Sequence, residues 1–187
     1  MDRCIRLAEG TEIPDKHTDT LLEAYTLCWY AHHGAFDVLY MDGESGLNNP
    51  KAIAELKRLA TTLTVKAPDQ HANYIESRNG ILRHTLHIME EELKRHSIDL
   101  PFNRLLAEAI FVCSAFTFYN GVSPHNAYTG RQPPLLPDLE NIDFDKDGEN
   151  TDGAREARIR QCGIEAITQT TAVAKITRAL KGKTSLD

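Results

Sequence analysis

The sequence has few cysteines and no long apolar run, and both shortages limit what the protein can be. Its 187 residues include four cysteines, which lie far apart and form no CxxC or CxxH pair. This usage predicts reduced, mostly buried thiols and argues against a zinc site or a disulfide framework. No apolar run approaches about 18 residues, and the first ten residues lack an apolar signal region. We therefore expect no membrane segment and a nuclear or cytoplasmic location.

The chain also has fewer basic than acidic residues. The chain has 27 acidic and 21 basic residues, a formal net charge of −6, whereas general nucleic-acid binding typically relies on a basic balance. The charge is unevenly distributed along the chain. Residues 138–152 contain seven acids and one lysine, and residues 154–187 contain seven lysines and arginines against three acids. Any affinity for DNA would therefore come from local patches and a bound metal ion.

The hydrophobic periodicity is that of a mixed α/β protein. The predicted helices span residues 18–33, 50–60, 73–95, 102–119 and 154–181. The predicted strands span residues 36–41 and 62–65, with a strand, a turn and a second strand over residues 1–14. Residues 120–137 are rich in glycine and proline, which predicts irregular structure. This alternation favours a buried α/β sheet with helices on both sides.

The helix predicted over residues 73–95 has two different faces. At about 100° per residue, one stripe is polar and carries Glu76, Gly80, Arg83 and His87, with Asn79 at its edge. The neighbouring stripe is apolar and carries Ile75, Leu82, Leu86, Met89 and Leu93. One face is therefore expected to pack, which leaves the other for chemistry.

Asp42 follows the strand predicted over residues 36–41. A carboxylate at the end of a strand, held opposite a carboxylate in the first turn of a helix such as Glu76, is a common way to bind a hard divalent cation. Ligand sites in α/β sheets collect beyond the carboxyl ends of the strands. Asp42 could equally be a turn residue before Gly43, and Glu76 could be favoured by the helix dipole, so these alternatives stay open.

Four segments stand out in order along the chain: FDVLYMDGESG, the loop from Pro68 to His71, YIESRNGILRHTL and YNGVSPHNAYTGRQPPLLPDL. Together they resemble the integrase catalytic core of retrotransposon and retrovirus-like polyproteins, over about residues 2–137. The resemblance implies an RNase H-like mixed sheet flanked by helices. It also implies transfer of DNA ends into target DNA by an acidic DDE triad that binds Mg²⁺ or Mn²⁺.

The resemblance also implies roles for individual residues. Asp42 and Glu76 match the second and third acids of the triad, which makes them the implied catalytic and metal-binding residues. The implied nucleic-acid-binding residues are Lys66, His71, Arg78, Asn79 and Arg83. DNA is the implied partner, without an organic cofactor or a membrane, and a homo-oligomer stays open.

The chain departs from the family at its start. The segment DRCIR at residues 2–6 matches the strand that follows the first acid, so we expect the first catalytic strand to be absent and DNA joining to be impaired. The expected domains are a partial integrase-like core over residues 1–137, an acidic linker over residues 138–153 and a C-terminal helix over residues 154–187.

Two other interpretations stay open. The first is a non-catalytic nucleic-acid-binding or assembly module on the same fold. The second is a calcium-binding interaction protein, because residues 143–154 begin with DFDKDG, the start of an EF-hand loop. The twelfth position of that loop is Ala154 and lacks the bidentate glutamate, which favours a solvated acidic linker.

Overall fold

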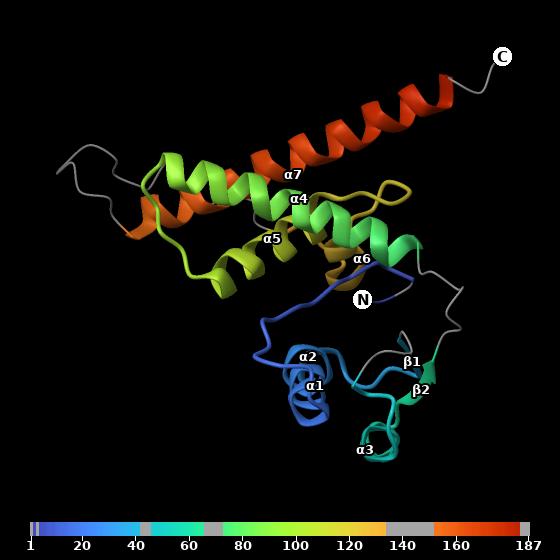
Figure 1. Ribbon diagram of the computed structural model, residues 1–187. Helices are drawn as coiled ribbons and strands as arrows, with labels where there is room; N and C mark the ends of the chain where they lie inside the picture. Colours follow the sequence, from blue (N-terminus) through green and yellow to red (C-terminus); the bar gives the residue numbers. More distant parts are fainter. Residues whose placement is uncertain (1, 3, 42–45, 66–72, 134–151, 184–187) are drawn as a thin grey trace. The chain divides into compact units, whose positions relative to one another are not determined.

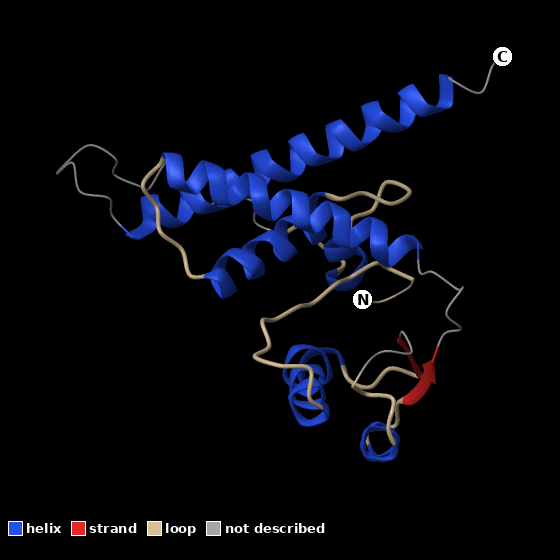
Figure 2. Ribbon diagram, in the orientation of Figure 1, coloured by secondary structure: helices blue, strands red, loops and turns tan. Residues whose placement is uncertain are grey.

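The polypeptide divides into two units, one formed by residues 9–73 and the other by residues 1–8 with residues 74–187. The computed structural model describes residues 2, 4–41, 46–65, 73–133 and 152–183 (Figure 1). The described chain is a mixed α/β structure, mostly helical, with one two-stranded parallel sheet (Figure 2). The predicted α/β class is confirmed at this level, whereas an RNase H-like sheet is not.

The smaller unit begins with a helical segment over residues 18–33. It consists of α1 (Thr18–Tyr25), the π-helical turn η1 (Thr26–Tyr30) and α2 (Ala31–His33). Gly34 follows with a φ of 78°, a left-handed conformation that glycine adopts without steric cost. The helix predicted over residues 18–33 is therefore confirmed, and Gly34 ends it.

The sheet of the smaller unit pairs β1 (Val38–Met41) with β2 (Thr62–Val65) in parallel. Parallel strands need a crossover connection, and this one contains α3 (Pro50–Arg58). Both strands and the helix between them were predicted. The expectation that residues 36–41 form a buried strand is wrong, because alternate residues of β1 are exposed, the pattern of a strand that is covered on one face.

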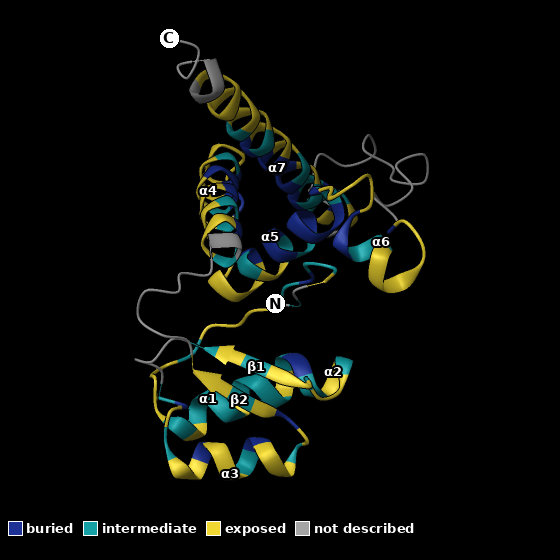
Figure 3. Cartoon of the chain, turned by 90° about the vertical axis from the view of Figure 1, so that its right-hand side faces the viewer, coloured by how far each residue is buried: buried dark blue, intermediate teal, exposed yellow. Residues whose placement is uncertain are grey.

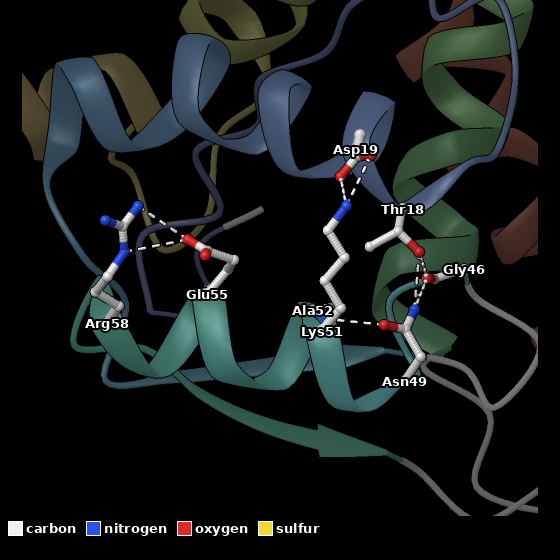
Figure 4. Close-up of polar contacts among 8 residues, drawn as sticks. All are labelled: Thr18, Asp19, Gly46, Asn49, Lys51, Ala52, Glu55 and Arg58. Carbon is white, nitrogen blue, oxygen red and sulfur yellow. Dashed lines mark hydrogen bonds and ion pairs between the residues drawn. The ribbon is translucent and has the colours of Figure 1, made fainter.

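Asn49 starts α3 and links it to α1. Its side-chain oxygen accepts a hydrogen bond from the backbone N–H of Ala52 at 2.9 Å, which caps the helix. Its side-chain nitrogen donates to the Gly46 carbonyl at 2.6 Å and to the Thr18 hydroxyl at 2.8 Å (Figure 4). Pro50 occupies the first helical turn, where its missing N–H has no cost. An asparagine followed by a proline is a standard signal for the start of a helix.

The larger unit contains four helices in its described residues: α4 (Asn73–Arg95), α5 (Phe102–Phe116), α6 (Pro124–Thr129) and α7 (Asp152–Lys183). Helices α4, α5 and α7 enclose a common apolar core, visible as their buried inner sides in Figure 3. The buried members of this core are Ile88, Met89, Leu93, Ile98, Leu105, Ala109, Val112, Cys113, Ile159, Cys162, Ala166 and Ile167. The predicted bounds of α4 are confirmed, and α7 begins two residues before the predicted start.

Helix α7 approaches its neighbours closely at Gly163. A Cβ atom at this position would lie 2.9 Å from Val112 Cγ1 and 3.4 Å from Met89 Cε. Real Cβ atoms essentially never come within 3.0 Å of another heavy atom, and Val112 is fully buried and stiff. The absence of a side chain at this position therefore lets α7 reach both α4 and α5.

The strand predicted at the start of the chain does not form in the described residues. The Asp2 carboxylate accepts hydrogen bonds from the backbone N–H groups of Cys4 and Ile5 at 2.8 and 2.7 Å. The Asp2 backbone N–H donates to the Leu7 carbonyl, and Arg6 has a φ of 64°. The Asp2 side chain thus closes a local turn with backbone groups that a strand would offer to a neighbour.

A short helix interrupts the stretch over residues 120–137 that was predicted to be irregular. In α6, the Ser123 hydroxyl accepts a hydrogen bond from the backbone N–H of Asn126 at 3.2 Å, and Pro124 follows the cap. Gly130 ends the helix with a φ of 74°. Each of these is a standard helix boundary signal, but together they delimit six residues, too few to show a periodic apolar pattern.

The acidic linker predicted over residues 138–153 lies outside the described residues except for Asp152 and Gly153, which form the start of α7. The predicted domain boundaries stay a prediction. Within the described ranges, every helix is too short or too polar to traverse a lipid bilayer.

Replacing Gly163 with alanine is expected to destabilise the protein by about 1–3 kcal/mol, because the added methyl group overpacks the contact with Val112. Gly80→Ala is the matched control, since a Cβ there would meet nothing within 4 Å and the change should stabilise α4 by up to about 1 kcal/mol. Urea unfolding of the three proteins measures both effects. Equal stability of the two variants would contradict the close approach of α7.

Candidate nucleic-acid interface

Helix α4 packs through the apolar stripe that its sequence predicts. Met89 and Leu93 are 0% and 2% exposed, and Leu82 and Leu86 are half-buried against the same core. The packing fixes the rotation of α4 about its own axis, because these residues recur at helical spacing on one side. The polar stripe next to them must then face outward.

The polar stripe of α4 is exposed. Its members are Glu76, Asn79, Gly80, Arg83 and His87. Glu76 lies in the first turn of the helix, where the dipole favours a carboxylate. No side-chain hydrogen bond or ion pair joins Asn79 or Arg83 to another described residue, so both side chains are available to a ligand. The spacing of the sequence predicts this arrangement correctly.

The C-terminal turns of α4 differ from this stripe because their charges pair with one another. Lys94 Nζ lies 2.7 Å from Glu90 Oε1, and Arg95 Nη1 lies 2.5 Å from Glu92 Oε1. The hydrogen bond from Lys94 lowers the pKa of the Glu90 carboxyl below its ordinary value. The charges of these turns therefore neutralise one another at the exposed surface. The candidate site lies nearer the N-terminus of the helix.

The predicted acidic pair is described only in part. Glu76 is on the exposed stripe of α4, whereas Asp42 lies outside the described residues, as do Lys66 and His71. Among the described residues, no group of three or more histidine, cysteine, aspartate or glutamate side chains is placed to hold a metal ion. Glu76 alone does not make a magnesium site, so its metal-binding role rests on Asp42 and stays a prediction.

Arg78 is not on the exposed stripe. Its side chain is 4% exposed, and its Nη2 donates a long hydrogen bond of 3.5 Å to Ser114 Oγ on α5. Its Nη1 is buried and has no hydrogen-bond partner among the described residues. Position 78 is about 200° around the helix from Glu76, on the side that faces α5. The expectation that Arg78 contacts nucleic acid from the surface is therefore not supported by its location.

A buried polar layer links α4, α5 and α7, and sequence analysis missed it. Thr85 Oγ1 donates to Thr170 Oγ1 at 3.4 Å, and Cys113 Sγ lies 3.8 Å from Thr85 Oγ1. Burial raises the pKa of the Cys113 thiol, which keeps it neutral and unreactive at physiological pH. The sequence does contain a signal for the burial of Thr85, because position 85 falls between the apolar positions 82 and 89 on the packing side of the helix.

The four cysteines are free, as predicted. Cys113 and Cys162 are buried, Cys28 is intermediate and Cys4 is exposed. The EF-hand-like stretch at residues 143–151 lies outside the described residues, so the calcium hypothesis gains no support from the structure.

Comparison with known proteins defines no family for this chain. No family model matches it, and no curated protein does. One similar solved structure is described as a cryoEM structure of the simian T-cell lymphotropic virus intasome in complex with PP2A regulatory subunit B56 gamma. The likeness has 17% sequence identity and a TM-score of 0.47, and it covers 69% of this chain and 45% of that chain. The chain thus spans less than half of that neighbour, and a likeness of this size leaves the fold family undefined.

Replacing Arg78 with methionine is expected to leave the protein as stable as the parent or up to about 2 kcal/mol more stable. Removing a buried charge that makes one long hydrogen bond relieves its desolvation cost, while methionine keeps most of the volume. Thermal unfolding measures the change, with Arg83→Met as an exposed control expected within about 0.5 kcal/mol of the parent. A loss above about 1 kcal/mol in Arg78→Met would show that the guanidinium forms a stronger interaction than its contact with Ser114.

Proposed function

We propose that this chain is a nucleic-acid-binding protein of the DNA-integration type and that the exposed stripe of α4 contacts DNA. One observation carries the proposal: α4 closes the core with one stripe and presents Asn79 and Arg83 to solvent on the next. An arginine offers a phosphate two N–H donors in a planar fork. An asparagine amide both donates and accepts, which suits an adenine edge. The two residues therefore provide one group for the DNA backbone and one for a base.

The resemblance of the sequence to integrase cores supports this type of chemistry. Along the chain, the strand β1 precedes α4, which carries Glu76 in its first turn, in the order that the resemblance implies. The Ser-Pro part of the closing segment forms the capped helix α6. On this basis the proposal includes an RNase H-like core as the finer description of the fold.

Electrostatics limits the expected affinity. The chain has a formal net charge of −6, so long-range attraction does not draw DNA to the protein as a whole. Binding would rest on a few local contacts, Arg83 among them, and each phosphate contact makes affinity sensitive to salt. We therefore expect weak binding of short duplexes that falls as salt rises.

Mg²⁺ or Mn²⁺ belongs to the proposal as the ion that Asp42 and Glu76 would hold. Carboxylate oxygens are the donors that Mg²⁺ prefers. When bound, such an ion supplies activation of a water or a DNA 3′-hydroxyl as the nucleophile. Two carboxylates hold one ion weakly and do not build a two-metal clamp. DNA joining by this chain is accordingly expected to be impaired, and DNA binding to be retained.

The alternative within this class is a non-catalytic nucleic-acid-binding or assembly module. Such a module would also contact DNA through the exposed stripe of α4, because neither Asn79 nor Arg83 needs a metal ion for that contact. Metal-dependent joining of DNA ends distinguishes the two, since only the integration protein requires the carboxylate pair.

Arg83→Ala is expected to weaken binding to a short DNA duplex about three- to tenfold and to reduce the slope of log affinity against log salt by about 1. Fluorescence anisotropy between about 50 and 200 mM salt measures both quantities. The matched control is Arg95→Ala, which removes an exposed arginine that pairs with Glu92 on the same helix. Its salt slope should equal that of the parent. An unchanged slope in Arg83→Ala would place the DNA on another surface.

Isothermal titration with Mg²⁺ and Mn²⁺ tests the acidic pair. Asp42→Asn and Glu76→Gln keep side-chain shape and remove charge, so each is expected to weaken metal binding at least about tenfold. Glu91→Gln is the control, since this exposed carboxylate lies on α4 beside His87 and away from the first turn. Absence of metal binding in the parent, or equal binding in the variants, would remove the metal from the proposal and leave the non-catalytic module.

A further inference from the structure

Arg78 is a buried charge for which the neighbouring helix supplies no acidic partner. Its Nη2 donates a 3.5 Å hydrogen bond to the neutral Ser114 hydroxyl, and its Nη1 has no partner among the described residues. Glu108, the acidic residue of α5, pairs instead with Arg160 on α7. Buried charges in proteins are normally paired or bound to an ion. The guanidinium of Arg78 therefore calls for an anion that the described side chains do not provide.

A second buried polar group without a partner lies at the end of α5. Thr117 directly follows this helix and is 8% exposed, and its hydroxyl has no hydrogen-bond partner in the described part of the chain. Residues three apart lie on one side of a helix end, so Thr117 shares a side of α5 with Ser114. The bond between Ser114 and Arg78 shows that this side faces α4. One guanidinium and two hydroxyls thus gather where α4 meets the end of α5.

The charge of Arg78 acts on the core around it. Burial raises the pKa of the Cys113 thiol, and the nearby guanidinium opposes that rise. A water molecule beside Arg78 would accept a hydrogen bond but would leave the charge uncompensated. An oxyanion supplies hydrogen-bond acceptors and negative charge together, and its bonds to a guanidinium are among the stronger ones in proteins.

We propose that Arg78, Ser114 and Thr117 form a binding site for a small oxyanion of the phosphate type. The planar fork of an arginine matches two oxygens of a phosphate. The serine and threonine hydroxyls donate to its remaining oxygens. Arg78 lies in the second turn of α4 and Ser114 in the last turn of α5, so the site is at the ends of two helices.

The burial of the site determines the size of the anion. Arg78 is 4% exposed, and a DNA duplex carries its phosphates on a wide, stiff surface that does not enter a buried site. A free phosphate is small enough to be enclosed by three side chains. The inference does not depend on the DNA contact proposed for the exposed stripe of α4, because Arg78 lies on the inner side of that helix.

The test compares thermal unfolding of the full chain in sodium phosphate and in sodium chloride at equal pH and ionic strength. A ligand that binds only the folded protein stabilises it, so phosphate is expected to raise the midpoint by at least about 2 °C over chloride. This rise should disappear in Arg78→Met. It should fall by about half or more in Thr117→Val, which replaces the unpartnered hydroxyl with a methyl group. Arg95→Ala, at an exposed arginine that pairs with Glu92, should keep the full rise.

Three results would overturn the proposal. The first is an equal rise in the parent, Arg78→Met and Thr117→Val, which would be the general stabilising effect of phosphate on folded proteins. The second is a midpoint of the parent that is the same in both salts. The third is a loss of duplex binding in Arg78→Met as large as in Arg83→Ala, which would assign Arg78 to the DNA surface.

The site and the proposed function can fail separately. Arg83→Ala tests the exposed stripe of α4 through duplex binding and its salt dependence, and it should keep the full phosphate-induced rise. Arg78→Met should bind the duplex within about twofold of the parent. Thr117→Val tests the anion site without changing a charge, so the outcome does not rest on the folding of one variant.

Discussion

The contact of α7 with α4 and α5 at Gly163 is the constraint on which the larger unit depends. Val112 and Met89 occupy the space that a side chain at position 163 would need. Since α7 lies against both helices there, the side chains that fill the remaining core, such as Leu93 and Ile167, follow from that approach. The same contact fixes the rotation of α4, because Met89 can reach Gly163 only when its own side of α4 turns inward. The exposed stripe of α4 is thus a consequence of a glycine on another helix.

The interior of this unit is not wholly apolar, and its polar residues include two on the inner side of α4. Arg78 and Thr85 lie on the inner side of α4, and both contact hydroxyl or thiol groups on neighbouring helices. Thr85 has neutral hydroxyl and thiol partners, whereas the Arg78 guanidinium makes one long hydrogen bond within the described part of the chain. A buried charge with so little compensation is costly. The apolar contacts of Met89, Val112 and Leu93 must therefore supply the stability that the guanidinium removes.

Local signals explain which elements the sequence predicts. Helix α4 has a long apolar period, α3 has an asparagine cap before a proline, and β2 is a run of β-branched residues, and all three form where expected. The strand predicted at residues 2–6 fails because the Asp2 carboxylate binds backbone N–H groups locally. Helix α6 was missed because six residues are too few to show a period. In the candidate site, spacing predicts the shared exposed face of Glu76, Asn79 and Arg83. Spacing also places Arg78 on the packing side, between Ile75 and Leu82, but the assignment of Arg78 to DNA followed its charge instead of its position.

The length of α7 needs two different explanations. Its first half is helical because the core covers it, as the burial of Ile159 and Ala166 shows. Its second half extends beyond that cover, so helix-forming residues such as Ala172, Ala174 and Ala179 must sustain it there. Helix propensity accounts for the backbone but not for where the large apolar residues lie. Val173 and Leu180 continue the spacing of the buried Ala166 and Thr170 at intervals of three and four, with Thr177 between them, whereas Ile176 lies beside that line, and all three apolar residues are exposed.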